Sequence, residues 1–302
     1  MAPRIRVERS GFAFDGHRLS YTVYGQGARP LVLLHGLLVS QRMHDPLARE
    51  LAARGHRVIT IDLLGHGASD RPAEMWRYSM SLYADQVIAL LDHLELDSAV
   101  VGGTSLGANV TLEVAARASR RLQAMVIEMP VLDNALLAAA GVFLPLALAL
   151  RFAESPARAI AALTRRIPSG LVPFWLDVGL DVLRQDPAPS AAVIQGILFG
   201  RVAPQHSERV TFGMPTLIIG HPRDPIHPFS DADMLARELP NAQLLQATSF
   251  LEMRLAPERL TNEMASFLDG CWPRRGRGVG ARALRPHIAA PRKAARPRSR
   301  PR

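Results

Sequence analysis

Short apolar runs and segments with a helical period alternate along most of the chain. Each run has three or four aliphatic or β-branched residues, a length typical of buried strands; the runs occupy residues 31–34, 58–61, 99–101, 125–127, 216–219 and 243–245. Between them, apolar residues recur at helical spacing, as at Tyr83, Val87, Leu90 and Leu94. Alternating strands and helices build mostly parallel sheets that are covered on both faces. The pattern therefore predicts an α/β protein with a mostly parallel central sheet and helices on both faces.

Two parts of the chain depart from this alternation. Residues 11–14 and 19–24 are predicted as strands around Asp15-Gly16, a dipeptide that accepts the positive φ angles of a tight hairpin, so the sheet is expected to start antiparallel. Residues 135–212 contain apolar, helical segments without a convincing strand. We therefore expect a core in two parts, residues 1–134 and 213–272, with a helical cap inserted between them.

The positive charge is concentrated at the end of the sequence. The formal net charge is +9, but residues 273–302 contain 11 of the 36 Lys and Arg residues and no acidic residue, which leaves 25 basic and 27 acidic side chains elsewhere. Because this segment is rich in Arg, Pro, Ala and Gly, we expect it to be a disordered basic tail. Nonspecific contacts with anionic surfaces are one role for such a tail, and a solvated extension without function is the alternative. The nearly neutral remainder predicts no specific nucleic-acid partner.

Cysteine usage and hydropathy predict the compartment. The single cysteine, Cys271, excludes an internal disulfide framework and a cysteine-based metal cluster, which fits a reducing cytoplasm. Residues 1–16 contain no apolar core of signal-peptide length. The most apolar stretch, residues 135–150, contains Pro145 and is shorter than the roughly 20 residues that a spanning helix needs. We expect a cytoplasmic protein with no membrane span, no metal and no cofactor.

A glycine-flanked serine follows one of the predicted strands. The sequence Gly103-Thr104-Ser105-Leu106-Gly107 comes directly after the strand at 99–101 and precedes a helical pattern. This is the context of a nucleophile elbow, in which a serine sits on a sharp turn from strand to helix. Only small residues two positions before and after the serine avoid collisions with the neighbouring strand and helix. Ser105 is therefore the candidate nucleophile.

A second turn supplies candidate oxyanion donors. His35-Gly36 follows the strand at 31–34, and the next backbone amide, that of Leu37, matches one half of an oxyanion hole. The amide of Leu106, directly after the nucleophile, would supply the other half. His35 and Gly36 are predicted to border the pocket, with a structural histidine that bonds to loop backbone as the alternative for His35.

The three motifs together resemble one superfamily. After the strand at 58–61 comes Asp62-Leu63-Leu64-Gly65-His66-Gly67-Ala68-Ser69-Asp70. This loop, the His-Gly turn and the Gly-Thr-Ser-Leu-Gly elbow, in that order, resemble the α/β-hydrolase fold superfamily over about residues 10–135 and 210–270. The resemblance implies a hydrolase of carboxylic-ester type that needs no cofactor.

The resemblance also implies an acid and a base, and only the acid is found where it is expected. In the superfamily the order is Ser, Asp, His, and Asp224 follows the strand at 216–219, with an ordinary Asp-Pro turn as the alternative. The histidine should follow the last strand, but the corresponding position is Phe250, and no histidine lies between His227 and His287. Removing the base of such a triad lowers turnover by about 10⁶. The conventional base is missing.

Two other residues are candidates for the missing base or for an alternative acid. His227 lies three residues after Asp224 on a loop that would border the site, so it is the best substitute base, while a loop histidine without a catalytic role is the alternative. Glu128 directly follows the strand at 125–127 and is predicted to face the pocket, either as an alternative acid or in a cap-anchoring ion pair.

Two functions follow from these residues. The first is hydrolysis of a small apolar ester, lactone or related carbonyl compound by Ser105, with a noncanonical or missing base; the apolar run at 136–150 could line an acyl-sized pocket. The second is a catalytically silent protein that binds an apolar ligand in the inherited pocket, with Phe250 as a packing surface. An adaptor that acts through its basic tail is a third, with no support from the rest of the chain.

Overall fold

The computed structural model describes residues 5–168 and 170–272. In this part of the chain the strands form one sheet in the order β1-β2-β4-β3-β5-β6-β7-β8. They are β1 (Val7–Phe14), β2 (His17–Tyr24), β3 (Pro30–Leu34), β4 (Arg57–Asp62), β5 (Ala99–Thr104), β6 (Leu122–Glu128), β7 (Thr216–Gly220) and β8 (Ala242–Gln246). β2 pairs antiparallel with both β1 and β4, and the remaining pairs are parallel. The predicted fold class is confirmed.

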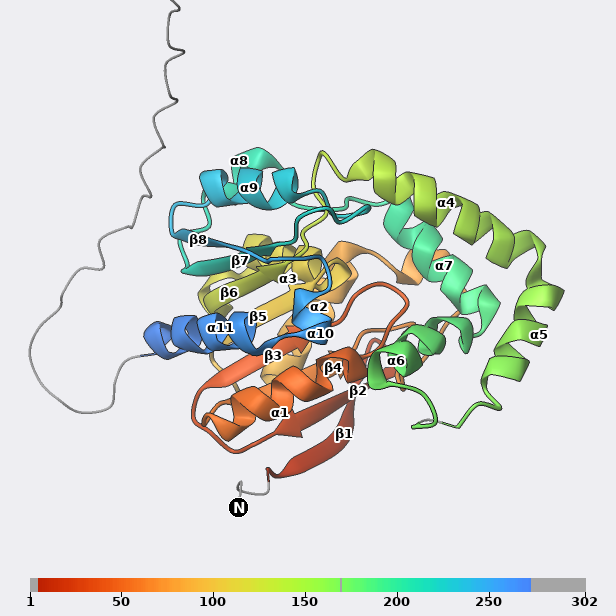
Figure 1. The fold of residues 1–302 in the computed structure, drawn as a ribbon, viewed down its shortest axis with the longest axis horizontal. Helices are drawn as coiled ribbons and strands as arrows, with labels where there is room; N and C mark the ends of the chain where they lie inside the picture. The colour runs from red at the N-terminus through yellow and green to blue at the C-terminus, as the bar shows by residue number, and fades with distance from the viewer. Residues whose placement is uncertain (1–4, 169, 273–302) are drawn as a thin grey trace, which may run out of the picture. The chain divides into compact units, whose positions relative to one another are not determined.

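Helices cover both faces of the sheet (Figure 1). The helices outside the insertion are α1 (Asp45–Ala53), α2 (Met80–His93), α3 (Leu106–Ala118), α9 (Phe229–Glu238), α10 (Glu252–Leu255) and α11 (Glu258–Cys271), with 3₁₀ turns η1 (Gln41–His44), η2 (Met75–Arg77) and η3 (Ser119–Arg121). Alternate residues of β3 point to opposite faces. Val32 packs with α2, α3 and α9, whereas Leu33 packs with α1 and α11.

The segment between β6 and β7 is helical. It contains α4 (Leu136–Phe152), α5 (Glu154–Thr164), α6 (Phe174–Leu183), α7 (Pro187–Leu198) and α8 (His206–Arg209), and its described residues contain no strand. Figure 1 shows α4 to α7 together on one side of the sheet, and we call these four helices the cap. α8 instead lies beside α9, where Arg209 Nε is 2.6 Å from Glu238 Oε2. The expectation of a disordered tail at 273–302 lies outside the described residues.

The apolar character of α4 bears on the question of membrane spans. In the described ranges, no single helix is long and apolar enough to cross a membrane. The pair α4 and α5 reaches the required length and composition only jointly, and the two helices are bent by 96°.

Candidate active site

Ser105 occupies a strained turn between β5 and α3. Its φ of 56° and ψ of −111° lie in a region that residues other than glycine rarely adopt. The Ser105 amide donates a hydrogen bond to the Glu128 carbonyl at 2.9 Å, which ties the turn to the end of β6. A Cβ atom at Gly103 would lie 2.4 Å from the carbonyl carbon of Gly107, and one at Gly107 would lie 2.2 Å from the Leu34 carbonyl oxygen. The two glycines of the motif are therefore required by the close approach of β5, α3 and β3.

His227 and Asp224 lie next to this turn. His227 Nε2 is 2.8 Å from Ser105 Oγ, and His227 Nδ1 is 3.1 Å from both carboxylate oxygens of Asp224. The Asp224 side chain also accepts the backbone amides of Ile226 and His227, at 2.8 and 2.9 Å. These two bonds close a local turn that directs the imidazole toward Ser105. The structure thus brings together the predicted nucleophile, the predicted acid and the substitute base.

The hydrogen bonds of this trio assign its protons. A carboxylate only accepts hydrogen bonds, so the imidazole carries its proton on Nδ1 and donates it to Asp224. Nε2 is then free to accept the hydroxyl proton of Ser105. Burial alone would raise the pKa of Asp224, but the hydrogen bonds from the His227 side chain and amide outweigh it and hold the pKa below its usual value. The carboxylate is therefore ionised at neutral pH.

The predicted oxyanion residues lie beside the nucleophile. Leu37 follows β3, Leu106 begins α3, and both line the same cavity as Ser105. β3 and β5 are neighbours in the sheet, so their carboxyl ends bring the two turns together. The next residue, Leu38, has a φ of 60°, and its carbonyl accepts a hydrogen bond from Gln185, which lies between α6 and α7 of the cap. The turn after β3 is therefore held by the neighbouring strand β5 and by a hydrogen bond from the cap.

The cavity next to Ser105 is almost entirely apolar. Its volume is about 230 Å³, and its lining residues are Leu37, Met80, Ser105, Leu106, Asn109, Val131, Leu136, Ala139, Ala140, Phe143, Ile194, Ile197, Leu198 and Val202. The amide of Asn109 is already occupied: it donates to the carbonyls of Val131 and Val202 and accepts the amide of Val131. Among these lining residues, Asn109 therefore uses its side chain to bind backbone groups, whereas the Ser105 hydroxyl lies beside His227 Nε2.

The four residues that the sequence predicted along the pocket wall do not line this cavity. His35 is buried; its Nδ1 lies 2.8 Å from the Gly36 carbonyl and its Nε2 accepts the Leu63 amide at 3.1 Å, so it acts as a structural histidine. Gly36 is not in the lining, although a Cβ atom at this position would lie 4.0 Å from Ser105 Cβ. Phe250 follows β8 and is 43% exposed. Position along the chain identified the right loops but not the direction of these side chains.

Glu128 is the fourth of these residues, and it lies beneath the nucleophile turn. Its carboxylate accepts a hydrogen bond from Thr104 Oγ1, lies 3.1 Å from Arg254 Nη2 and 3.2 Å from His221 Nε2, and is buried. Burial would raise the pKa of Glu128, but the charge of Arg254 and the contact with His221 lower it well below the usual value. This arrangement matches the predicted ion-pair alternative rather than a second acid in the pocket, although its cation Arg254 comes from α10 rather than from the cap.

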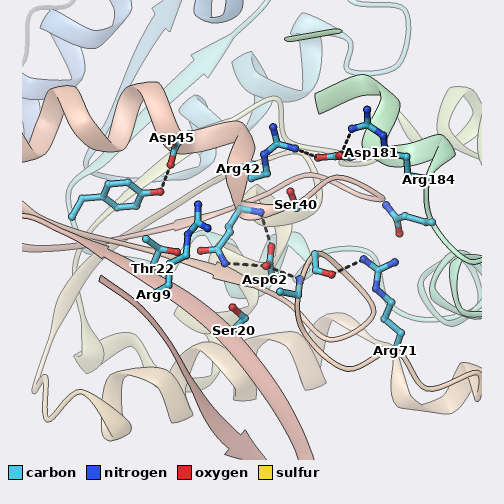
Figure 2. Close-up of a pocket in the computed structure, with 15 residues that line it drawn as sticks. Arg9, Ser20, Thr22, Ser40, Arg42, Asp45, Asp62, Arg71, Asp181 and Arg184 are labelled. Atoms are coloured by element: carbon cyan, nitrogen blue, oxygen red, sulfur yellow. Dashed lines mark hydrogen bonds and ion pairs between the residues drawn. The ribbon is translucent and has the colours of Figure 1, made fainter. Parts of the chain in front are cut away.

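A second, polar cavity lies between the core and α6 (Figure 2). Its volume is about 340 Å³, and it shares no lining residue with the cavity at Ser105. Arg42 of η1 and Asp181 and Arg184 of the cap belong to its wall, together with Asp62. Sequence patterns gave no signal for this cavity because its residues come from distant segments.

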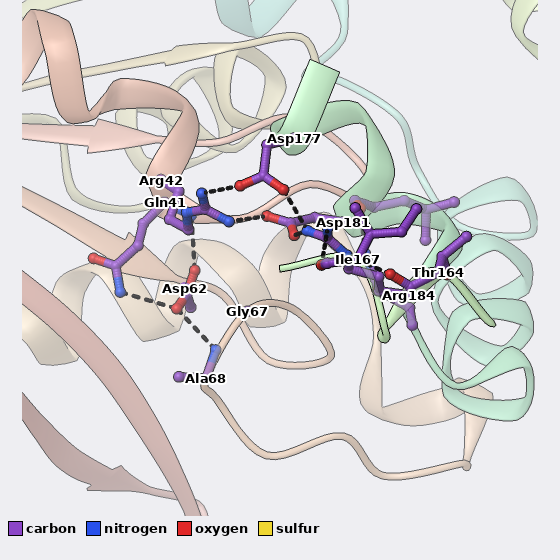
Figure 3. A network of polar contacts seen from close by, with 12 residues as sticks. Gln41, Arg42, Asp62, Gly67, Ala68, Thr164, Ile167, Asp177, Asp181 and Arg184 are labelled. Carbon is purple, nitrogen blue, oxygen red and sulfur yellow. Dashed lines mark hydrogen bonds and ion pairs between the residues drawn. The ribbon is translucent and has the colours of Figure 1, made fainter. Parts of the chain in front are cut away.

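An ion-pair network beside this second cavity ties the cap to the core (Figure 3). Asp177 of α6 lies 2.8 Å from Arg42 and 2.7 Å from Arg184, and Asp181 lies 2.9 and 3.0 Å from the same two guanidinium groups. Hydrogen bonds from Arg42 and Arg184 lower the pKa of Asp177. Since Arg42 belongs to the segment that follows the oxyanion turn, the network fixes the cap relative to that turn.

The described residues include no group of three or more His, Cys, Asp or Glu side chains arranged for a metal ion.

Comparison with known proteins identifies the family. Residues 29–248 match the family model described as the alpha/beta hydrolase fold. The AB hydrolase superfamily protein YisY of Bacillus subtilis is 38% identical over 89 residues, 30% of this chain and 32% of that protein. The dihydrolipoyllysine-residue acetyltransferase component of the acetoin cleaving system of Pseudomonas putida is 32% identical over 261 residues, 81% of this chain and 64% of that protein. The match spans less than two thirds of the length of each of these relatives.

Solved structures agree on the fold. The enol-lactonase of Burkholderia xenovorans LB400 superposes with a TM-score of 0.69 at 22% identity, and the match covers 86% of this chain and all of that chain. The family model covers more than two thirds of the chain, and the sheet order and the elbow at Ser105 are those of the same fold. The chain belongs to the α/β-hydrolase fold family.

Proposed function

We propose that this protein hydrolyses small apolar esters or lactones through a covalent intermediate on Ser105. The observation that carries the proposal is the continuous hydrogen-bonded chain from Ser105 Oγ through His227 to Asp224. A serine hydroxyl is a weak nucleophile until an adjacent base takes its proton. His227 has the required distance, the required tautomer and an oriented acid behind it, and so takes the place of the base that is missing at position 250.

The geometry supports a conventional acyl transfer with an unconventional source of the base. As Ser105 Oγ attacks the carbonyl carbon, His227 Nε2 takes the hydroxyl proton, and Asp224 stabilises the imidazolium. The negative charge moves to the carbonyl oxygen, which the amides of Leu37 and Leu106 are placed to receive. The imidazolium then protonates the leaving alkoxide. In the second half, His227 deprotonates a water molecule, whose oxygen attacks the acyl carbon. The imidazolium then returns the proton to Ser105 Oγ as the bond to the acyl group breaks, which releases the carboxylic acid product.

The cavity favours an uncharged, compact acyl group. Its wall offers no charged side chain, so a charged group would lose its hydration without compensation. Its volume is about 230 Å³, which is below the usual range of about 300–1,000 Å³ for ligand pockets. A short acyl group therefore suits this cavity, whereas the chain of a long fatty acid would have to extend out of it.

Ester hydrolysis by four forms of the protein tests the mechanism. With 4-nitrophenyl butyrate and hexanoate as substrates, we expect turnover by the wild type and a fall of about 10⁴-fold or more in kcat for both Ser105→Ala and His227→Ala. The matched control is Phe250→Ala, which removes an aromatic ring from the conventional base position without touching the cavity. Its kcat should stay within about threefold of the wild type.

Different failures have different meanings. Equal rates for the wild type and Ser105→Ala would overturn the serine mechanism. Loss of activity in Ser105→Ala but not in His227→Ala would support Ser105 as the nucleophile and would contradict His227 as the base. Binding of a hexanoyl methyl ketone by the wild type, with no turnover of either ester, would instead support the catalytically silent ligand-binding protein.

A further inference from the structure

The helix that opens the cap exposes a continuous apolar stripe. Leu137 is 88% exposed and Phe152 is 83% exposed, and Leu144 and Leu148 are each about half exposed. Spacings of seven, four and four residues place these side chains on one face of α4. The helix has 17 residues and is about 25 Å long, and these side chains extend along nearly all of it. We call these four residues the α4 stripe.

The opposite side of the same helix is also apolar, and it belongs to the candidate active site. Ala139 and Phe143 line the cavity at Ser105, and Ala147 packs against Leu38 and Ile194. In Figure 1, α7 lies between α4 and the sheet, so the α4 stripe faces away from the core. A helix that is apolar on all sides is normally enclosed. Here one side is left in water, which costs free energy in proportion to its apolar area.

The charges around the α4 stripe have one predominant sign. Between residues 133 and 167 the basic side chains are Arg151, Arg158, Arg165 and Arg166. The acidic ones are Asp133, which lies 3.7 Å from Arg209, and Glu154, which lies 2.6 Å from Arg158. Arg151 directly precedes Phe152, at the end of the stripe. An apolar helix face that ends beside Arg151, with Arg165 and Arg166 after the next helix, matches a phospholipid surface, which offers hydrocarbon below a layer of anionic headgroups.

From this combination we infer that the cap docks on an anionic phospholipid surface, with α4 lying in the interface and the α4 stripe in contact with the acyl chains. A second copy of the chain is the alternative occupant of the α4 stripe, and it would appear as a dimer that does not bind vesicles. Docking would bring one wall of the Ser105 cavity close to the hydrocarbon layer. The inference concerns binding only and does not depend on the chemistry proposed for Ser105.

Vesicle sedimentation with the full chain tests the inference. With vesicles of phosphatidylcholine and phosphatidylglycerol in a 3:1 ratio, at 0.15 M salt, we expect the wild type to sediment with the lipid. The triple variant Leu137→Gln, Leu144→Gln, Leu148→Gln should partition at least 100-fold less well, since each leucine contributes roughly tenfold. Glutamine keeps a high helix propensity, so α4 itself should remain folded.

The matched control is Leu176→Gln, Leu183→Gln, Leu255→Gln, which changes three other exposed leucines outside α4 and α5. It should bind vesicles as the wild type does, and so should Ser105→Ala. All of these proteins keep residues 273–302, so a loss confined to the α4 variant cannot come from that basic segment. Three results would overturn the inference: no binding by the wild type, equal binding by the α4 variant, or a wild-type dimer that dissociates in the α4 variant without any vesicle binding.

Discussion

At the scale of single residues, the site depends on a histidine three positions after its acid. Ser105 was predicted because strand, helix and glycines around an elbow leave a signature in sequence. His227 was only the best of several replacements, because the direction of its ring depends on the turn that Asp224 closes with two backbone amides. Spacing along a chain does not reveal such a turn. In the proposed mechanism, the contact between His227 Nε2 and Ser105 Oγ replaces the histidine that is missing at position 250.

Asp224→Asn tests whether the acid sets the tautomer of His227. Asparagine keeps the shape of the side chain and an oxygen that accepts the two backbone amides, so the turn should persist. Its amide nitrogen can donate to His227 Nδ1, which favours the tautomer with the proton on Nε2 and removes the acceptor for Ser105. We expect kcat for 4-nitrophenyl butyrate to fall about 10⁴-fold with KM changed by less than about threefold. A variant with unchanged kcat and an unchanged unfolding midpoint would show that Asp224 has no part in catalysis.

At the scale of elements, the site is built where β3, β5 and α3 converge. The sequence predicted each of these strands and the helix, but it ended β5 at Val101, whereas the strand continues through Gly102 and Gly103 to Thr104. Glycine is disfavoured in strands by propensity. Here packing against the adjacent strand requires glycine despite its low strand propensity, because a Cβ atom at Gly102 would lie 2.8 Å from Val126 Cβ.

Gly107→Ala should destabilise this junction. The new methyl group would overlap the carbonyl of Leu34 at the end of β3, and overpacking against backbone costs about 2–3 kcal/mol in the free energy of unfolding. Because the oxyanion turn follows β3, kcat should fall as well. The matched control is Gly270→Ala in α11, where a Cβ atom meets no neighbour within 4 Å. Urea titration should show the control gaining about 0.5–1 kcal/mol, and a similar gain for Gly107→Ala would contradict the proposed crowding.

The apolar run of α4 marks a limit of sequence reasoning at this scale. The run predicted either a pocket wall or cap packing, and Phe143 and Ala147 do serve these two purposes. The exposure of Leu137 and Leu148 was not predicted. Polar residues on one side of a helix indicate which side faces water. Between Leu136 and Leu150 this helix has none, so its orientation is decided by the partners that fold against it.

At the scale of the whole molecule, the sheet and its cap enclose several histidines that carry no role in the proposed chemistry. His35, His44 and His66 are buried near the carboxyl ends of β3 and β4, and burial lowers the pKa of each. Protonation of each of them therefore destabilises the folded state. The sequence predicted a structural role for His35 alone, because the burial of the others depends on how η1 and the loop after β4 close over the sheet.

The best-defined case is His44, whose pKa is lowered to about 4 by burial. In the unfolded chain the pKa is about 6.5. As the pH falls from 6.5 towards 4, the unfolded state binds a proton that the folded state excludes, so the free energy of unfolding is highest above pH 6.5 and decreases below it. This single group should account for about 2 kcal/mol of the loss at pH 5.

Urea unfolding of the wild type and His44→Gln between pH 7.5 and pH 5 measures this contribution. Glutamine does not titrate, and its amide can still donate to the Leu34 carbonyl, which His44 Nε2 contacts at 3.0 Å. We expect the variant to be less stable at pH 7.5 but to lose about 2 kcal/mol less than the wild type on acidification. Most carboxylates remain ionised throughout this range, so the difference reports on the imidazole. Parallel pH profiles for the two proteins would show that His44 is protonated as easily in the folded state as in the unfolded chain.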